Sequence, residues 1–366
     1  LGQYFGARDT VRMRRSIVVS TLLCLLLSAV IMLLCCGLAH PILQWMQTPE
    51  DILQDAYDYM FVVLLGTAAT VFYNMISNIL RALGDSRTPL VYLVLTSLLN
   101  VVLDILFIVP LGMGVAGAAW ATVLSQLLSA ICCTISGLKH FEVMHPKRED
   151  FSHLWPDAAA HLKIGFPMAF QMSVMCIGQL AMQASVNAIG SAAVAGYTAA
   201  TKADQVSVLI NNAMITAIST YVAQNFGAHN MERIKKGVRA SLIQTEALNL
   251  LMCVGMLLLR RPIVYLFISS PSSEIISFSN GYINIVAPCY FMLGVLAVYR
   301  TAVQSMQNTA APFAACMVEL VMRIGCTMLL TLWLGYYGVC IASPLAWLGA
   351  CAIVVPAYYI TLRKYQ

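Results

Sequence analysis

Charged residues are scarce in this sequence. Asp, Glu, Lys and Arg together make up only 10% of its 366 residues, whereas a soluble domain contains about 25%. Hydrophobic residues make up 60%, and long apolar stretches recur from one end of the chain to the other. This composition excludes an ordinary soluble protein and predicts a protein of the lipid bilayer.

The sequence also lacks the motifs of common catalytic and metal sites. No HExxH, GxSxG or CxxC motif occurs. The twelve cysteines all lie in apolar runs, where we expect them to pack as small hydrophobic residues. Four histidines share one polar linker without the spacing of metal ligands: His140, His145, His153 and His161. We therefore expect no enzymatic activity and no cofactor.

Ten apolar stretches are long enough to cross a bilayer. A membrane helix needs about 20 residues, because it rises 1.5 Å per residue through about 30 Å. The resulting fold class is an all-α polytopic membrane protein. In one loop, Thr48 and Pro49 predict the start of a helix. The ten expected helices cover residues 16–38, 54–80, 89–109, 115–137, 161–189, 193–222, 238–259, 278–304, 312–334 and 338–361.

Basic residues are distributed unevenly between the loops on the two faces of this bundle. One set of loops holds 16 of the 21 Lys and Arg residues, and the other holds only Arg260 and Arg261. By the positive-inside rule, the first set is cytoplasmic, so Leu1 begins on the cytoplasmic side of the cell membrane. The rule also explains these basic loops without nucleic-acid binding. The cytoplasmic set comprises residues 1–15, 81–88, 138–163, 223–239, 305–311 and the C-terminus.

The chain contains an internal repeat. The segment "GQYFGARDTVRMRRS" near the N-terminus returns as "AQNFGAHNMERIKKG" at an offset of 221 residues. Pro89 and Gly112 match Pro312 and Gly335 at an offset of 223. Six predicted helices separate the two FGA loops, so the repeats run parallel and their symmetry axis is expected along the membrane normal.

The repeat predicts two helical lobes. The expected N-terminal lobe covers residues 1–137 and holds four helices. A cytoplasmic linker covers 138–160, and a C-terminal lobe with six helices covers 161–366. Because the second lobe has six helices, we expect two further helices to precede Leu1.

Five stretches carry a resemblance to the multidrug and toxic compound extrusion (MATE) family. They are the two FGA loops with their basic clusters, "RALGDSRTP", "NVVLDILFI" and "GVAGAAWATVLSQ". The resemblance implies a fold of twelve helices in two six-helix lobes. It also implies export of organic cations in exchange for sodium ions or protons, while the lobes rock about the FGA and "RALGDSRTP" loops. The expected hinge residues are Gly6, Gly84, Pro89, Gly227 and Pro312.

Three polar residues form the candidate cation-coupling site. Asn100 and Asp104 are four residues apart, so they share one helix face. At helical rise, Asp104 lies about 22 Å above the inner surface and Thr122 about 10 Å below the outer one. These depths agree within a 30 Å layer. Their oxygens suit a sodium ion, and the carboxylate alone suits a proton. The DinF-like branch of the family has a similar Asn-x-x-x-Asp followed by Thr, together with an aspartate on its first helix.

The C-terminal lobe has a second polar set. Glu319 and Arg323 have the spacing of an ion pair on one helix. Arg300 lies near the cytoplasmic end of its helix, where it can extend toward the surface. The helix 161–189 offers only glutamines where some family members carry an acid. The complete set is Lys202, Asp204, Glu246, Arg300, Glu319 and Arg323, of which the first two are expected near the midplane, pairing across helices.

We expect a monomeric secondary antiporter that exports amphipathic organic cations. The alternative is a flippase for lipid-linked oligosaccharides, which needs basic residues to hold a diphosphate. Lys202, Arg300 and Arg323 favour that alternative, but four intramembrane acids oppose it. An enzyme within the bilayer would need a nucleophile and base, or a metal site, that the sequence does not offer.

Overall fold

The computed structural model describes residues 1–45 and 50–365. Within these residues the secondary structure is helical, with no strand, and ten spans are long and apolar enough to cross a membrane. The predicted all-α membrane fold is therefore confirmed. The chain divides into two compact units, Leu1–His161 and Leu162–Gln366, which are called unit 1 and unit 2 below.

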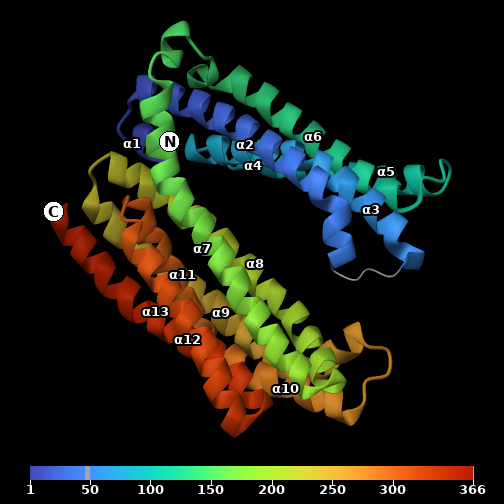
Figure 1. Cartoon of the computed structure of the whole chain (residues 1–366). Coiled ribbons are helices and arrows are strands. Elements are labelled where there is room, and N and C mark those ends of the chain that lie inside the picture. The colour runs from blue at the N-terminus through green and yellow to red at the C-terminus, as the bar shows by residue number, and fades with distance from the viewer. Residues whose placement is uncertain (46–49, 366) are drawn as a thin grey trace. The chain divides into compact units, whose positions relative to one another are not determined.

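Unit 1 is built from α1 to α6 (Figure 1). The stretch expected as one helix over 54–80 is interrupted at Gly66, which separates α3 from α4. A side chain at Gly66 would overlap Val123 of α6, so the glycine allows these helices to approach closely. Thr48 and Pro49 lie outside the described residues. The bounds are Gly2–Gly6 for α1, Thr10–Trp45 for α2, Glu50–Leu65 for α3, Thr67–Ala82 for α4, Arg87–Ile108 for α5 and Gly114–His140 for α6.

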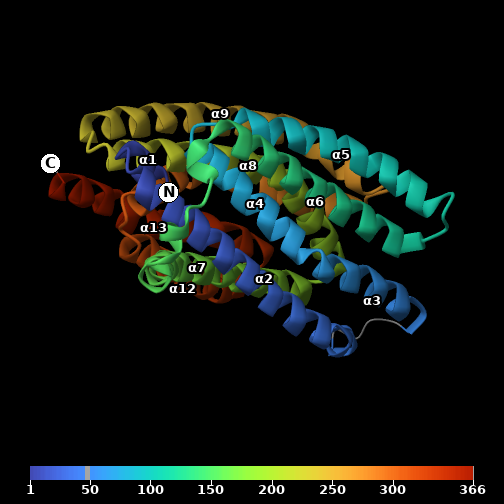
Figure 2. The ribbon, with the colours of Figure 1, turned by 90° about the horizontal axis from the view of Figure 1, so that it is seen from above.

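Unit 2 is built from α7 to α13, and its boundary with unit 1 falls within the first turns of α7. The expected helix 278–304 is divided by a short 3-10 turn at Ala287–Cys289. Figures 1 and 2 both show α12 lying along α13, with which it packs. The bounds are Leu154–Ile189 for α7, Ser191–Gly227 for α8, Met231–Phe267 for α9, Ser273–Val286 for α10, Tyr290–Ser305 for α11, Ala310–Leu334 for α12 and Tyr336–Lys364 for α13.

The internal repeat is also present in the backbone. The helix pair α3–α4 begins at Glu50 and ends at Ala82, and the pair α10–α11 begins and ends 223 residues later, at Ser273 and Ser305. Left-handed backbone conformations recur at the same offsets, although neither residue of the first pair and only one residue of the second is glycine. The three pairs are Arg8 (φ 57°) with His229 (φ 53°), Gly84 (φ 93°) with Gln307 (φ 66°), and Gly112 (φ 60°) with Gly335 (φ 56°).

The starts of α2 and α5 in unit 1 and of α9 and α12 in unit 2 carry the same kind of side-chain cap. In unit 1 the capping side chains are the carboxylates of Asp9 and Asp85, and in unit 2 they are the amides of Asn230 and Asn308. Burial raises the pKa of Asp85, but hydrogen bonds from Thr88 and Arg87 and the charge of His140 together outweigh it, so this pKa lies below its ordinary value of 3.8. Each cap accepts from a backbone N–H three residues on: Arg12 (3.0 Å), Thr88 (3.0 Å), Arg233 (3.0 Å) and Ala311 (3.3 Å).

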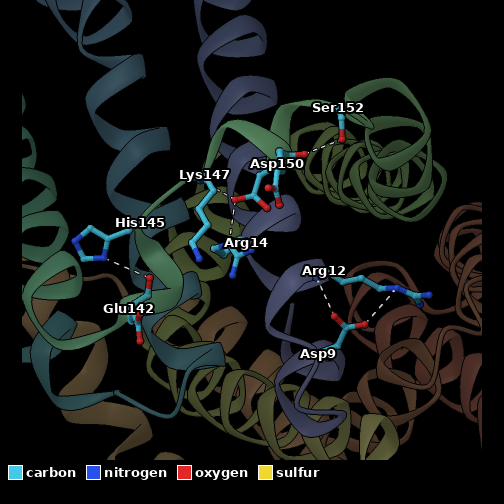
Figure 3. A network of polar contacts seen from close by, with 9 residues as sticks. Asp9, Arg12, Arg14, Glu142, His145, Lys147, Asp150 and Ser152 are labelled. Atoms are coloured by element: carbon cyan, nitrogen blue, oxygen red, sulfur yellow. Dashed lines mark hydrogen bonds and ion pairs between the residues drawn. The ribbon is translucent and has the colours of Figure 1, made fainter.

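The segment between α6 and α7 is fixed to the start of α2 by a buried ion pair (Figure 3). Arg14 Nε of α2 donates to Asp150 Oδ2 over 3.0 Å, and the Asp150 side chain is only 1% exposed. The same oxygen accepts from the backbone N–H of Lys147 over 2.8 Å. A second contact, Ser16 Oγ to His161 Nε2 at 3.0 Å, lies two residues further along α2. These bonds hold the polar segment and the start of α7 against α2.

Replacing Asp150 with Asn is expected to release this segment. Burial raises the pKa of Asp150, but the Lys147 N–H and the Arg14 guanidinium together lower it below 3.8. A carboxyl group whose pKa is lowered when the segment is docked stabilises the docked segment fully above pH 3.8, its ordinary pKa. This stabilisation is lost as the pH falls through the lowered pKa. At neutral pH, Asp150→Asn removes a charged hydrogen bond, so hydrogen exchange at residues 147–151 should quicken about 10- to 100-fold.

The matched control for this variant is Glu149→Gln, because Glu149 is the neighbouring acid and is exposed. Exchange in the Glu149→Gln protein should stay at the wild-type rate. Equal exchange rates in the Asp150→Asn protein and the wild type would show that the ion pair does not hold the segment.

Candidate functional site

The candidate coupling residues lie on α5 and α6, which pack side by side. Asn100 Nδ2 donates to Thr122 Oγ1 over 3.5 Å, a long hydrogen bond that joins the two helices. Thr122 Oγ1 in turn donates to the carbonyl oxygen of Ala118 over 3.1 Å. The structure thus joins Asn100 to Thr122, whereas the comparison of depths had placed Asp104 level with Thr122.

Asp104 lies one turn beyond Asn100 on the same face of α5, without a bond to either of the other two residues. It is half-buried, and its Oδ1 is fully buried without a hydrogen-bond partner among the described residues. Burying a polar oxygen unpaired costs about 1–3 kcal/mol, and more for a charged group. This oxygen is therefore free to bind a further group.

The neighbourhood of α5 is strongly apolar. Four aliphatic side chains near Asp104 on α5 are at least 55% exposed and face the surroundings of unit 1: Leu98, Val101, Val102 and Ile105. So apolar a helix surface makes an ionised carboxylate within a bilayer costly and strengthens any interaction that neutralises it.

A polar contact that the sequence analysis missed lies close by. Thr70 of α4 donates to the side-chain oxygen of Gln126 of α6. Gln126 follows Thr122 by four residues, so both occupy one face of α6. The segment "TVLSQ" carries this spacing, and a search for polar pairs at helical intervals would have found it. The polar face of α6 thus reaches both α4 and α5.

In unit 2, Glu319 of α12 binds two arginines at once. Its Oε2 lies 2.6 Å from Arg300 Nη2 of α11, and its Oε1 lies 2.8 Å from Arg323 Nη2 one turn along α12. The side chains of Arg300, Arg323 and Glu319 are only 15%, 8% and 4% exposed. The idea that Arg300 extends toward the surface is therefore wrong, because its guanidinium is held inside unit 2 by Glu319.

Lys202 and Asp204 of α8 contact different helices, as their spacing of two residues requires. Tyr282 of α10 donates its hydroxyl to Asp204 Oδ2 over 3.2 Å. The Lys202 ammonium is exposed and lies 5.8 Å from the ring centroid of Phe267, at the end of α9, a distance at which a cation is attracted to the ring face. Glu246 of α9 is beside α11: a Cβ atom at Gly294 would lie 2.6 Å from its Oε1.

The expected hinge residues lie at helix ends. Gly6 and Gly227 are the last residues of α1 and α8, and Gly84 is in the turn after α4 with φ 93°. Pro89 and Pro312 occupy the first turns of α5 and α12, where a helix tolerates proline because those N–H groups have no partner within the helix. Their positions allow bending at these ends; that they act as hinges stays a prediction.

Comparison with known families and sequences gives concordant matches. The MatE family model matches residues 1–106 and 167–329. The chain is 31% identical over 317 residues to the probable multidrug resistance protein YpnP of Bacillus subtilis, covering 86% of this chain and 70% of that protein. It is 24% identical over 337 residues to the FAD transporter of Shewanella oneidensis, covering 88% and 72%. It is 26% identical over 319 residues to the probable multidrug resistance protein NorM of Thermotoga maritima, covering 83% and 65%.

Solved structures show the same fold. A crystal structure titled as MATE in complex with MaL6 superposes with a TM-score of 0.92 at 22% identity, covering all of this chain and 82% of that one. An outward-facing multidrug resistance transporter superposes with a TM-score of 0.91 at 23% identity, with the same coverage. The arrangement of helices is therefore shared at low sequence identity.

Proposed function

Because the chain belongs to the MATE family, we propose that it is a secondary antiporter exporting amphipathic organic cations in exchange for sodium ions or protons. Two of the relatives named above are described as multidrug resistance proteins, which supports this class of substrate. The observation that carries the coupling half of the proposal is the half-buried Asp104, whose Oδ1 has no partner among the described residues.

Asp104, Asn100 and Thr122 form the proposed coupling site. Asn100 lies one turn from the Asp104 carboxylate on α5, and its side chain is joined to the Thr122 hydroxyl of α6. These oxygens are hard ligands of the kind a sodium ion accepts, while a proton needs the carboxylate alone. Either ion neutralises Asp104 and so shifts the balance between inward-open and outward-open states. The hinges at Gly6, Gly84, Pro89, Gly227 and Pro312 accommodate that change.

The polar residues of unit 2 support the antiporter over the flippase. A flippase needs basic groups free to hold a diphosphate, but Arg300 and Arg323 are both bound to Glu319. Asp204 is bound to Tyr282, so this part of unit 2 is already internally paired. Lys202 is the exposed cation of the set, and Glu246 adds a further negative charge.

The proposal includes an arrangement in the membrane. The N-terminal lobe covers residues 1–137, the cytoplasmic linker 138–160 and the C-terminal lobe 161–366. The protein acts as a monomer in the cell membrane with Leu1 on the cytoplasmic side, because the basic loops are expected there.

The test is transport by the purified protein in proteoliposomes. A fluorescent organic cation is followed under an imposed sodium gradient, an imposed pH gradient, or neither, with protein-free vesicles as the blank. Transport driven by one gradient, and abolished by an ionophore that collapses it, supports antiport and identifies the ion. Transport that no gradient alters would contradict ion coupling, and no transport of any organic cation would contradict the substrate class.

A further inference from the structure

Arg260 and Arg261 are exceptions to the charge distribution of the loops. They lie near the end of α9, on the face that otherwise lacks basic residues, where positive charge is disfavoured. Arg260 has an internal partner, because its Nη1 donates to Asn284 Oδ1 of α10 over 2.9 Å. Arg261 makes no hydrogen bond or ion pair with the residues that the structure describes. Arg261 is exposed, so its guanidinium is free to bind an anion from outside the chain.

Arg261 lines a cavity of 530 Å³ that lies wholly within unit 2. Three helices form its walls: α9, α10 and the start of α13. No carboxylate lines it in the described part of the chain, so the guanidinium sets its charge. The principal lining side chains are Arg261, Tyr265, Ser273, Ser277, Asn280 and Tyr337.

The wall contributed by α10 is a polar stripe on a membrane helix. Ser273, Ser277, Asn280 and Asn284 follow one another at intervals of four, three and four residues, which places them on one face. Their hydroxyl and amide groups supply hydrogen-bond donors opposite Arg261. Guanidinium, hydroxyl and amide donors converging on a cavity without carboxylates suit a phosphate group.

The surroundings of the cavity are those of a membrane interface. Tyr265 and Tyr337 are 57% and 49% exposed at the ends of their helices, where tyrosines collect at the level of lipid headgroups. Val254 and Leu258 are also exposed, and they share the face of α9 that carries Arg261 and Tyr265. An apolar track on α9 thus leads along the membrane-facing surface to the cavity.

We propose that this cavity binds the phosphate of an anionic phospholipid from the outer leaflet. Arg261 contacts the phosphate, the α10 stripe donates to the headgroup oxygens, and an acyl chain lies along Val254 and Leu258. The site goes beyond the proposed transport function and does not depend on it. It rests on the position of the cavity at the face opposite the basic loops.

The test is lipid binding by the full chain, held in nanodiscs or micelles of neutral phosphatidylcholine and titrated with phosphatidylglycerol. Native mass spectrometry measures the bound lipid. Arg261→Gln should weaken phosphatidylglycerol binding about tenfold, because a charge-assisted hydrogen bond is lost. The matched control is Arg239→Gln, which removes the same exposed charge near the opposite end of α9 and should leave the affinity unchanged.

Two further measurements make the result decisive. Ser277→Leu places a larger side chain in the cavity from α10 and should weaken lipid binding as Arg261→Gln does. The two variants test the site independently, so the test stands if one of them folds poorly. Soluble glycerol 3-phosphate carries the same phosphate without acyl chains and should bind far more weakly than the lipid. Wild-type affinity in both variants would overturn the site, and equal affinity for the soluble phosphate would overturn its assignment to a lipid.

Discussion

Replacing Asp104 with Asn should reduce gradient-driven transport of an organic cation by at least about tenfold, and up to about 100-fold. Asparagine keeps the size of the side chain and one of its oxygens, but it cannot carry a negative charge or take up a proton. An acidic residue inside a membrane helix is costly and is usually retained for function. In Asp104 this cost arises at the buried Oδ1, which has no hydrogen-bond partner among the described residues.

The measurement compares wild-type and Asp104→Asn proteins in proteoliposomes under the gradient that drives the wild type. Asp58→Asn is the matched control, because it changes the same residue type in unit 1, where Asp58 accepts a hydrogen bond from Gln54 over 2.9 Å. The control should transport at the wild-type rate. If Asp104→Asn transports equally well, coupling belongs to other acids and Asp104 is a packing residue.

The neighbours of Asp104 distinguish the two ions. Asn100 and Thr122 provide oxygens that a sodium ion needs and a proton does not. With sodium coupling, replacing either by Ala should raise the sodium concentration for half-maximal transport. With proton coupling, the same variants should leave the pH dependence near that of the wild type. This pattern separates a three-residue ion site from a single titrating carboxylate.

Hydropathy alone predicted most of the architecture, because a membrane helix must satisfy its backbone internally over a fixed thickness. The ten spans follow from that constraint, while the repeat follows from residues that match at offsets of 221 and 223. The interruption at Gly66 does not, because hydropathy says nothing of the close approach of Val123 on another helix to this glycine. The mirrored break at Ala287–Cys289 shows that such details belong to the repeat even where residue identity is lost.

How well each polar contact could be predicted depended on whether its two residues lie on one helix or on different helices. Helical rise placed Thr122 near the depth of Asp104, but the packing of α5 against α6 joins it to Asn100, one turn away. Glu319 and Arg323 share one helix, so their spacing was sufficient. The partner of Arg300 was not predictable from its own helix, since a long side chain can reach several neighbours. Helix packing, which places α11 against α12, decides that it binds Glu319.

Replacing Glu319 with Gln should destabilise unit 2 by about 3–5 kcal/mol, because one carboxylate compensates two buried guanidinium groups. The amide cannot supply the charge, and Arg300 and Arg323 would then repel each other without a partner. For a unit of this size, the midpoint of thermal unfolding should fall by roughly 10 °C. Thermal unfolding in detergent measures the effect. Glu274→Gln is the control, because Glu274 is exposed on α10 and its variant should unfold near the wild-type temperature.

A triple replacement then separates stability from transport. With Glu319→Leu, Arg300→Met and Arg323→Met together, the buried charges are exchanged for apolar side chains, which is often neutral or stabilising. If the triad only joins α11 to α12, the triple variant should recover both the unfolding temperature and gradient-driven transport. Recovered stability without transport would instead assign the triad to the transport cycle. A Glu319→Gln protein as stable as the wild type would show that the two arginines find other partners, and that the triad does not hold these helices together.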